Sequence, residues 1–210
     1  MRFGAIIVIL LTEREMFDTI NANEDEVRRG KMAEFKIEND VLIRYLGKKK
    51  NVNVPTSVHT VGRYAFGGCE NLEKVVIPEG VTAIEEGAFM KCFYLREIVI
   101  PESVTKIGAR AFADCRRLQE VSLIGVETIE EWAFDRCDGL IRVTLGNHVK
   151  TIENHAFFDC YSLGEIGIPR SVEHIGKDVF GLCPHLTLSV FENSDAELYA
   201  IENDINFQNI

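Results

Sequence analysis

Six cysteines are the residues of this chain whose chemistry and spacing are most regular. They stand 23, 23, 22, 23 and 23 residues apart, at Cys69, Cys92, Cys115, Cys137, Cys160 and Cys183. Zinc sites need closely spaced ligand pairs such as C-x-x-C, and the sequence contains none. If the intervals are stacked repeats, neighbouring cysteines lie about 4.8 Å apart, which disulfide geometry permits. Each cysteine nevertheless stands three residues before a regularly spaced leucine, so we expect small buried thiols that fill a core.

The other residues able to do chemistry form no recognisable catalytic set. The histidines occupy different positions within the intervals, at His59, His148, His155, His174 and His185. No G-x-S-x-G, H-E-x-x-H, P-loop or G-x-G-x-x-G motif is present. A catalytic cysteine needs an exposed, activated thiolate, whereas these cysteines are expected to be buried. The sequence therefore predicts a protein that is not an enzyme and that uses no metal and no other cofactor.

Paired carboxylates, a lysine run and the single tryptophan have simple interpretations. The Glu-Glu pairs at 85–86 and 130–131 precede an Ala-Phe dipeptide, where acidic residues favour the start of a short helix. The three lysines at 48–50 are typical of a solvated loop tip. Trp132 stands at a variable position of the interval, which indicates solvent exposure. An exposed aromatic side chain either marks a contact site or has no role.

Composition limits the class of partner. The chain has 210 residues, and 46% of them are hydrophobic, which is enough for a sizeable core. It carries 33 acidic and 23 basic residues, for a formal net charge of −10. Nucleic acids and anionic membranes attract a basic face, so we expect no general affinity for either. A protein is the expected partner.

The first residues leave the compartment open. The apolar run 3–11 is too short for a membrane span, which takes about 20 residues. It has the length of a signal-peptide core, but no small-x-small cleavage site follows it. Alternatively, the Arg-Arg-Gly at 28–30 is what a purine-rich ribosome-binding site would encode, so that 1–31 would be an extension ahead of a true start at Met32. The protein is cytoplasmic if translation starts at Met32, and otherwise secreted or at the cell surface.

Phenylalanine and leucine keep the same register as cysteine. The phenylalanines are Phe66, Phe89, Phe112, Phe134, Phe157 and Phe180, and the leucines are Leu72, Leu95, Leu118, Leu140, Leu163 and Leu186. Three residue types that recur with the same period indicate a repeat protein in which each unit stacks on the next.

Each repeat combines a strand signal with a helical signal. Val75 and Ile77 have the period of a short strand with one buried face, and Pro78 ends that strand. The apolar residues of 81–84 and 88–92 recur at spacings of three and four, which predicts tight helical turns. No unit can bury its own apolar face, so the units must stack. The predicted fold is an α/β repeat solenoid, with short parallel strands on a concave face and short helical turns or irregular segments on a convex face.

The repeat resembles a known family. The pattern L-x-x-[IV]-x-[IL]-P…V-x-x-I-x-x-x-A-F-x-x-C resembles the BspA-like class of leucine-rich repeats over about residues 35–207. The resemblance implies an N-terminal hairpin cap at 32–57, leucine-rich repeats at 58–191 and a C-terminal helical cap at 192–210. Caps are also required physically, because an uncovered end repeat exposes core and strand edges. Members of this class are typically surface or secreted proteins of bacteria and some protists, associated with adhesion.

Two parts of the repeat array depart from the pattern. The repeat around Gly125 is one residue short, and this repeat and the next lack the proline, so we expect a tighter turn there. In the last repeat the segment 186–190 loses the L-x-x-V spacing, which is consistent with the chain leaving the solenoid.

The outward side chains of the strands are the candidate binding surface. They mix both charges with small and β-branched residues and contain no aromatic stripe, so a plain solvated sheet is the alternative. We therefore predict a monomeric, non-catalytic protein–protein interaction module, for which the resemblance implies cell-surface adhesion. The alternative is an intracellular scaffold, because cysteines without disulfides suit a reducing compartment. The candidate residues are Lys74, Val76, Glu97, Val99, Glu120, Ser122, Arg142, Thr144, Glu165 and Gly167.

Overall fold

The computed structural model describes residues 34–210, and the structural statements below concern this part of the chain. The predicted extension at 1–31 and the start proposed at Met32 lie outside the described residues. Residues 35–210 form one compact unit.

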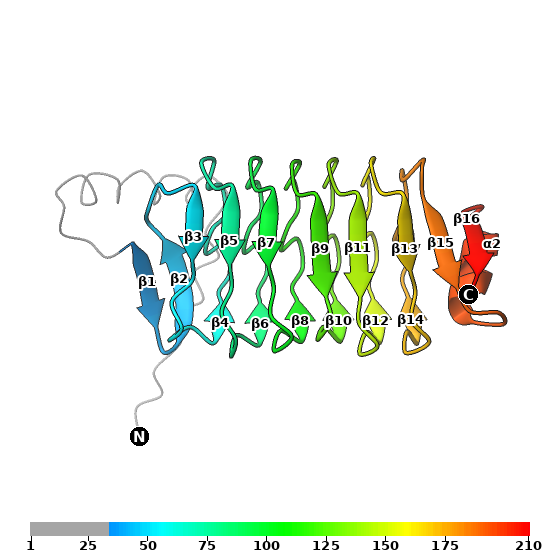
Figure 1. The fold of residues 1–210 in the computed structure, drawn as a ribbon, viewed down its shortest axis with the longest axis horizontal. Coiled ribbons are helices and arrows are strands. Elements are labelled where there is room, and N and C mark those ends of the chain that lie inside the picture. Colours follow the sequence, from blue (N-terminus) through cyan, green and yellow to red (C-terminus); the bar gives the residue numbers. More distant parts are fainter. Residues whose placement is uncertain (1–33) are drawn as a thin grey trace, which may run out of the picture. The chain divides into compact units, whose positions relative to one another are not determined.

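This unit is a β-solenoid whose turns build two eight-stranded sheets around one core (Figure 1). The long-strand sheet contains β3 (Asn51–Asn53), β5 (Lys74–Val76), β7 (Glu97–Val99), β9 (Glu120–Leu123), β11 (Arg142–Leu145), β13 (Glu165–Gly167), β15 (Thr187–Val190) and β16 (Asn206–Asn209). The short-strand sheet contains β1 (Phe35–Glu38), β2 (Val41–Tyr45), β4 (Thr60–Val61), β6 (Ala83–Ile84), β8 (Lys106–Ile107), β10 (Thr128–Ile129), β12 (Thr151–Ile152) and β14 (His174–Ile175).

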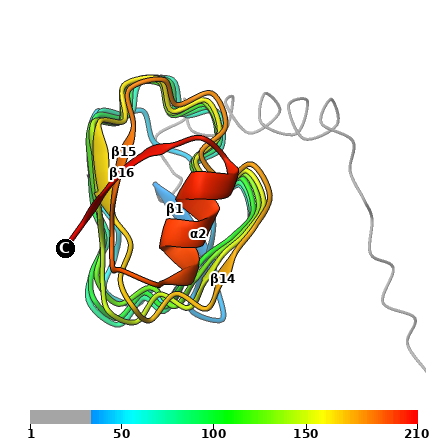
Figure 2. The ribbon, with the colours of Figure 1, turned by 90° about the vertical axis from the view of Figure 1, so that its right-hand side faces the viewer.

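Parallel pairing keeps equivalent residues of successive turns in line. Val75 of β5 pairs with Ile98 of β7, and Val143 of β11 pairs with both Val121 and Ile166. These central residues are buried, whereas their neighbours along each strand are exposed or half-buried. Viewed along the stack, successive turns lie almost directly behind one another (Figure 2). The period-2 strand signal of the sequence is therefore confirmed.

The phenylalanine ladder is the centre of the core. The six rings from Phe66 to Phe180 stack face to face, with centroids 4.8 to 5.7 Å apart and interplanar angles of at most 11°. Five of them are fully buried and Phe180 is 3% exposed. Stacked rings at this spacing bury a large apolar surface in every turn, so the ladder holds neighbouring repeats together.

The cysteines form a second buried ladder beside the phenylalanines. All six are free thiols, and four are buried while Cys69 and Cys183 are half-buried. The thiols of Cys92 and Cys115 donate hydrogen bonds to the carbonyl oxygens of Phe66 and Phe89, at 3.1 and 3.2 Å. The expectation of small buried thiols is thus confirmed for the four central cysteines.

The predicted helical turns are wrong. Within residues 34–210 the only helix is α2 (Asp195–Glu202), at the C-terminal end. The segment before each cysteine is a series of tight turns. Along it, one backbone N–H donates to a carbonyl oxygen of its own repeat and the next N–H donates to a carbonyl oxygen of the following repeat. The N–H of Ala65 donates to Gly62, whereas that of Phe66 donates to Ala88 of the following turn.

Left-handed backbone at two positions of each repeat explains this difference. The residue before Ala-Phe and the residue before cysteine have positive φ, between 48° and 61° for every non-glycine example. Such residues interrupt a right-handed helix and turn alternate N–H groups towards the neighbouring repeat. The residues before Ala-Phe are Tyr64, Gly87, Arg110, Trp132 and His155, and Asp178 takes this position before Val179-Phe180 in the last repeat.

The short-strand sheet was not predicted. Isoleucines such as Ile84 and Ile107 are the buried residues of its two-residue strands, which pair in parallel. The spacing of three between Val81 and Ile84, which favoured a helix, instead covers the irregular residues 81–82, which follow a turn, and the strand β6. A two-residue strand is too short to show a period.

The shortened repeat does not interrupt the long-strand sheet. β9 and β11 pair over four residues, up to Leu123 and Leu145. Gly125 and Gly146 follow these strands, and a Cβ at either would overlap a backbone carbonyl oxygen of the preceding turn. The chain approaches its neighbour closely because both residues lack a side chain.

A hairpin and a helix cover the two ends of the unit. β1 pairs antiparallel with β2 at one end. At the other end α2 lies across the last turn and buries Ala196, Tyr199 and Ala200 (Figure 2). The side chain of Ser194 caps α2 by accepting the N–H of Glu197.

Candidate protein-binding surface

The outward side of the long-strand sheet, which we name the strand face, carries all ten candidate residues. Lys74 and Val76 are half-buried and the other eight are exposed. Strand register arranges them in two rows that run across the stack. One row is charged and the other is small and uncharged, so the structure brings the candidates together as one continuous surface.

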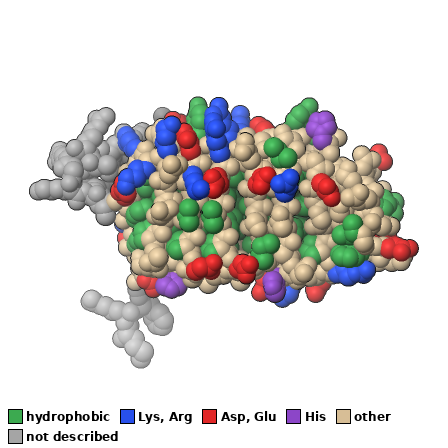
Figure 3. All heavy atoms as spheres, in the orientation of Figure 1, with side chains coloured by type: hydrophobic (Ala, Val, Ile, Leu, Met, Phe, Trp, Pro, Cys, Tyr) green, Lys and Arg blue, Asp and Glu red, His purple; other side chains and the backbone are tan. Residues whose placement is uncertain are grey.

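The charged row neutralises itself in pairs. The ammonium of Lys74 lies 2.5 Å from the carboxylate of Glu97, and the guanidinium of Arg142 lies 3.0 Å from that of Glu120. Figure 3 shows this row of basic and acidic side chains across the middle of the face. Glu97, Glu120 and Arg142 are well exposed and the Lys74 side chain is partly exposed, so each pair contributes little to folding stability.

Glu165 continues the row into the C-terminal end. Its Oε1 accepts hydrogen bonds from Ser189 Oγ at 2.8 Å and from Gln208 Nε2 at 3.3 Å. Gln208 also donates to Ser189 Oγ at 2.9 Å. Ser189 and Gln208 were not among the surface residues predicted from the sequence, because the repeat pattern is lost in the last strands.

The uncharged row forms the flatter part of the face. Val99 is 43% exposed, and Ser122, Thr144 and Gly167 continue its row. No heavy atom lies within 4 Å of the position that a Cβ on Gly167 would occupy. This row is therefore open to a ligand.

The paired carboxylates bridge neighbouring repeats. Glu86 accepts from the Tyr64 hydroxyl at 2.9 Å and pairs with Arg63. Glu130 lies 2.9 Å from the ammonium of Lys106 and accepts the backbone N–H of Ala109. The predicted role at a helix start is thus replaced by contacts between turns, since there is no helix there.

Trp132 is half-buried rather than solvent-exposed. Its ring stacks on His155 of the next repeat, with centroids 3.9 Å apart and an interplanar angle of 3°. The edge of Phe158 packs against both rings, at 5.6 and 5.5 Å. These residues support one another, so the position of Trp132 has a structural explanation.

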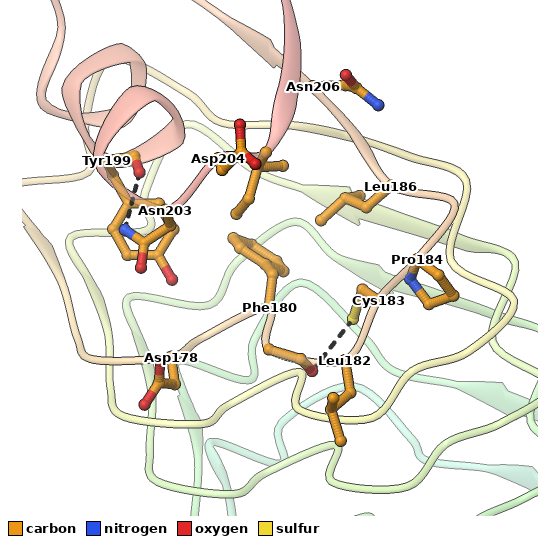
Figure 4. A pocket seen from close by; sticks show the side chains of 12 residues that line it. Asp178, Phe180, Leu182, Cys183, Pro184, Leu186, Tyr199, Asn203, Asp204 and Asn206 are labelled. Atoms are coloured by element: carbon orange, nitrogen blue, oxygen red, sulfur yellow. Dashed lines mark hydrogen bonds between the residues drawn. The ribbon is translucent and has the colours of Figure 1, made fainter.

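A hollow of about 320 Å³ lies between the last repeat and the C-terminal cap (Figure 4). Phe180 and Leu186 face Tyr199 and Asn203 across it. The Tyr199 hydroxyl accepts the N–H of Val179, and Asn203 Nδ2 donates to the Tyr199 carbonyl oxygen at 2.8 Å. The Tyr199 hydroxyl therefore holds the cap on the last repeat, whereas the Asn203 bond lies within the cap, at the end of α2.

The described residues contain no cluster of histidine, cysteine, aspartate and glutamate that could hold a metal ion. The pKa of the Cys92, Cys115 and Cys137 thiols is raised by burial, and that of Cys69 rises to about 11 for the same reason. Burial thus keeps these four thiols protonated near neutral pH.

Parallel strands, tight turns and a repeated leucine define a leucine-rich-repeat solenoid. The sequence matches the model of the BspA type leucine rich repeat region in six copies, over residues 37–125 and 82–209. The chain belongs to this family. A comparison with curated proteins gives no match.

Solved structures of bacterial leucine-rich-repeat proteins are similar. A leucine-rich cell surface protein from Faecalibacterium prausnitzii A2-165 is 27% identical, with a TM-score of 0.63 over 77% of this chain and 53% of that one. A leucine-rich-repeat protein from Eubacterium ventriosum is 29% identical, with a TM-score of 0.53 over 69% and 46%. The pneumococcal vaccine antigen PcpA, at 20% identity and a TM-score of 0.68 over 84% and 45%, shares the fold.

This chain spans about half of the length of these three proteins. In the described part of the chain, α2 is too short to cross a membrane, and no other helix is present.

Proposed function

We propose that this chain is a non-catalytic protein-binding module that presents its strand face to a protein partner in cell-surface adhesion. The observation that carries the proposal is the strand face itself. Five neighbouring parallel strands place ten outward side chains in two aligned rows. Extended sheets of stacked repeats are the surfaces with which solenoid proteins typically bind proteins.

The burial and the hydrogen-bond partners of the reactive groups support a non-catalytic role. The central thiols are buried and bonded to backbone carbonyls, and Glu86 and Glu130 bridge repeats. Catalysis requires a nucleophile or base that faces a substrate cavity. In the C-terminal hollow, the Tyr199 hydroxyl instead accepts a backbone N–H of the last repeat.

Two observations bear on the compartment. The similar protein from Faecalibacterium prausnitzii is described as a cell surface protein, which supports a surface location. The absence of disulfides among the described cysteines favours the second candidate, an intracellular scaffold. Fractionation of the source cells separates the two, because recovery of the native protein only from the cytosol contradicts adhesion.

The covered ends support action as a monomer. The β1–β2 hairpin and α2 occupy the two ends at which another copy would extend the stack. Light scattering of the purified chain measures its mass, and a concentration-independent dimer contradicts this part of the proposal.

The strand face is tested by capture of partners. The full chain is immobilised beside a double variant, Ser122→Arg with Thr144→Arg, which places two bulky cations on the uncharged row. A matched control, Thr82→Arg with Thr105→Arg, adds the same two cations at exposed residues beside the short-strand sheet. We expect partners bound by the native chain and by the control to be lost with the strand-face variant. Equal capture by all three proteins contradicts the proposal.

A further inference from the structure

One edge of the solenoid combines arginines with exposed aromatic rings. The turns that lead into β7 and β9 carry Phe93, Tyr94, Arg96, Arg116 and Arg117, which we name the arginine edge. Tyr94 is 45% exposed and the three arginines are exposed. Figure 3 shows Lys and Arg side chains gathered with hydrophobic ones along the upper border, above these strands.

Stacking between turns orders this edge. The guanidinium of Arg117 lies over the ring of Tyr94, 4.7 Å from its centroid. That of Arg116 lies over Phe93 at 5.4 Å. Each arginine thus rests on an aromatic residue of the preceding repeat, in the range of cation–π attraction. Planar guanidinium groups held in this way lose less side-chain entropy when they bind a ligand.

Positive charge is in excess at the part of the edge that Arg96 and Arg117 form. Arg116 is paired with Asp114 at 2.8 Å, and the carboxylates of Asp138 and Asp159 also act on its charge. Within residues 34–210, neither Arg96 nor Arg117 has a carboxylate oxygen within the 4.0 Å of an ion pair. The carboxylate whose charge they influence is Glu73, which already accepts a hydrogen bond from Lys50 at 2.6 Å. Lys50, Arg96 and Arg117 therefore share one carboxylate.

This excess contrasts with the rest of the surface. The chain has a net charge of −10, and the cations of the strand face are paired within that face. An acidic ligand is therefore repelled by the surface as a whole and attracted at the arginine edge. Guanidinium groups pair with carboxylates in bidentate geometry, and tyrosine and arginine dominate the strongest protein contacts.

We propose that the arginine edge binds an extended acidic segment of a protein partner, with apolar residues between its carboxylates. Arg96 and Arg117 bind the carboxylates, while Tyr94 and Phe93 contact the apolar side chains. The two stacked turns of the edge lie about 4.8 Å apart, which about two residues of an extended chain span. The proposal rests on the protein-binding role above and names the chemistry of the partner.

The experiment is a fluorescence-anisotropy titration of the full chain against a labelled peptide of alternating glutamate and leucine, about eight residues long. The variant Arg96→Glu with Arg117→Glu reverses the two unpaired charges. The control, Arg170→Glu with Lys177→Glu, makes the same change in net charge elsewhere. We expect saturable binding that is roughly tenfold or more weaker for the edge variant than for the control.

Three further arms complete the test. The same peptide with glutamine in place of glutamate should bind at least about tenfold more weakly, because its charge is lost. Tyr94→Ala should weaken binding several-fold without a change in net charge. A heparin oligosaccharide is the competing anionic ligand. Equal loss in edge variant and control, no saturable binding, or tighter binding of heparin than of the peptide each overturns the proposal.

The outcome is separable from that of the proposed function. Ser122→Arg with Thr144→Arg should leave peptide binding unchanged, since these residues lie outside the arginine edge. If partner capture still depends on the strand face but the peptide does not bind, only the arginine edge fails. If the peptide binds at the edge while capture is independent of the strand face, only the proposed function fails.

Discussion

The thiol of Cys115 donates a hydrogen bond to the backbone carbonyl oxygen of Phe89, 3.2 Å away, across the boundary between two repeats. The same contact links Cys137 to Phe112 and Cys160 to Phe134. The carbonyl oxygen of Phe89 also accepts the N–H of Cys92, so the thiol adds a second hydrogen bond to it and fills space beside the phenylalanine ladder. Cysteine recurs in every repeat because a small, weakly polar group is needed there.

Replacement of this thiol predicts a pH-dependent loss of stability. Cys115→Ala should lower the free energy of unfolding by about 1–2 kcal/mol at pH 7, from lost burial and a small cavity. Burial raises the pKa of the Cys115 thiol, so it stays protonated in the folded protein while the unfolded thiol ionises above about pH 8.5. The stabilisation is therefore complete below pH 8.5 and decreases at higher pH, by up to about 1.4 kcal/mol per pH unit.

Urea unfolding at pH 7 and pH 9.5 measures this effect. The difference between the native chain and Cys115→Ala should shrink at the higher pH. A core substitution without a titratable group, such as Phe112→Ala, is the control and should show the same difference at both values. If the difference in unfolding free energy between the native chain and Cys115→Ala were independent of pH, the thiol would ionise as freely in the folded protein as in the unfolded one.

Loss of one ring from the phenylalanine ladder should be far more costly. Phe112 is fully buried and stacks on Phe89 at 5.2 Å and on Phe134 at 5.0 Å. Phe112→Ala should lower the free energy of unfolding by about 3–5 kcal/mol, because both stacking partners lose a neighbour and a cavity remains. Chemical denaturation measures it, with the exposed Thr105→Ala as control. A loss below about 1 kcal/mol would be incompatible with a core position.

The core was predictable from sequence because Phe, Cys and Leu each occupy one buried position in every turn. The path of the chain between those positions was not. From a sequence, left-handed backbone is normally predicted at glycine. Here Tyr64, Arg110, Trp132 and His155 adopt it, and their residue types do not indicate it. The hydrogen bonds that compensate are made to the next repeat, as from Phe66 N–H to Ala88, and a single unit's sequence does not reveal them.

The ion pairs of the strand face should matter little for folding. Glu97 is well exposed and the Lys74 side chain is partly exposed, so solvent screens their attraction. Lys74→Met, which retains much of the side-chain volume, should change the free energy of unfolding by less than about 1 kcal/mol. Thermal denaturation measures it, and Arg142→Met tests the second pair in the same way. A larger loss in both would make the charged row a folding determinant rather than an available surface.

The strand face and the arginine edge were not equally visible in the sequence. Alternation along each strand placed all ten residues of the face, since residues that flank a buried Val or Ile must point outward. The edge depends on contacts between residues about one repeat apart, such as Arg117 on Tyr94. No pattern within one repeat contains that pair, and only the stacking of turns brings it together.

Gly125 and Gly146 should be the two most sensitive of the glycines at strand ends, and Gly125 lies in the shortened repeat. A Cβ at this position would overlap the carbonyl oxygen of Glu102 in the preceding turn, which is backbone and has no rotamer to adopt. Gly125→Ala should therefore force two turns apart and lower the free energy of unfolding by about 3 kcal/mol, at the upper end of overpacking costs. Gly167→Ala is the matched control, because no heavy atom lies within 4 Å of its Cβ position and its φ is not positive. It should be neutral or stabilising by about 0.5 kcal/mol, since alanine restricts the unfolded chain. Chemical denaturation of both variants measures the two changes in unfolding free energy. Equal changes would mean that the shortened repeat can accommodate a Cβ at position 125, and that the deletion of one residue rather than the glycine determines the tight turn.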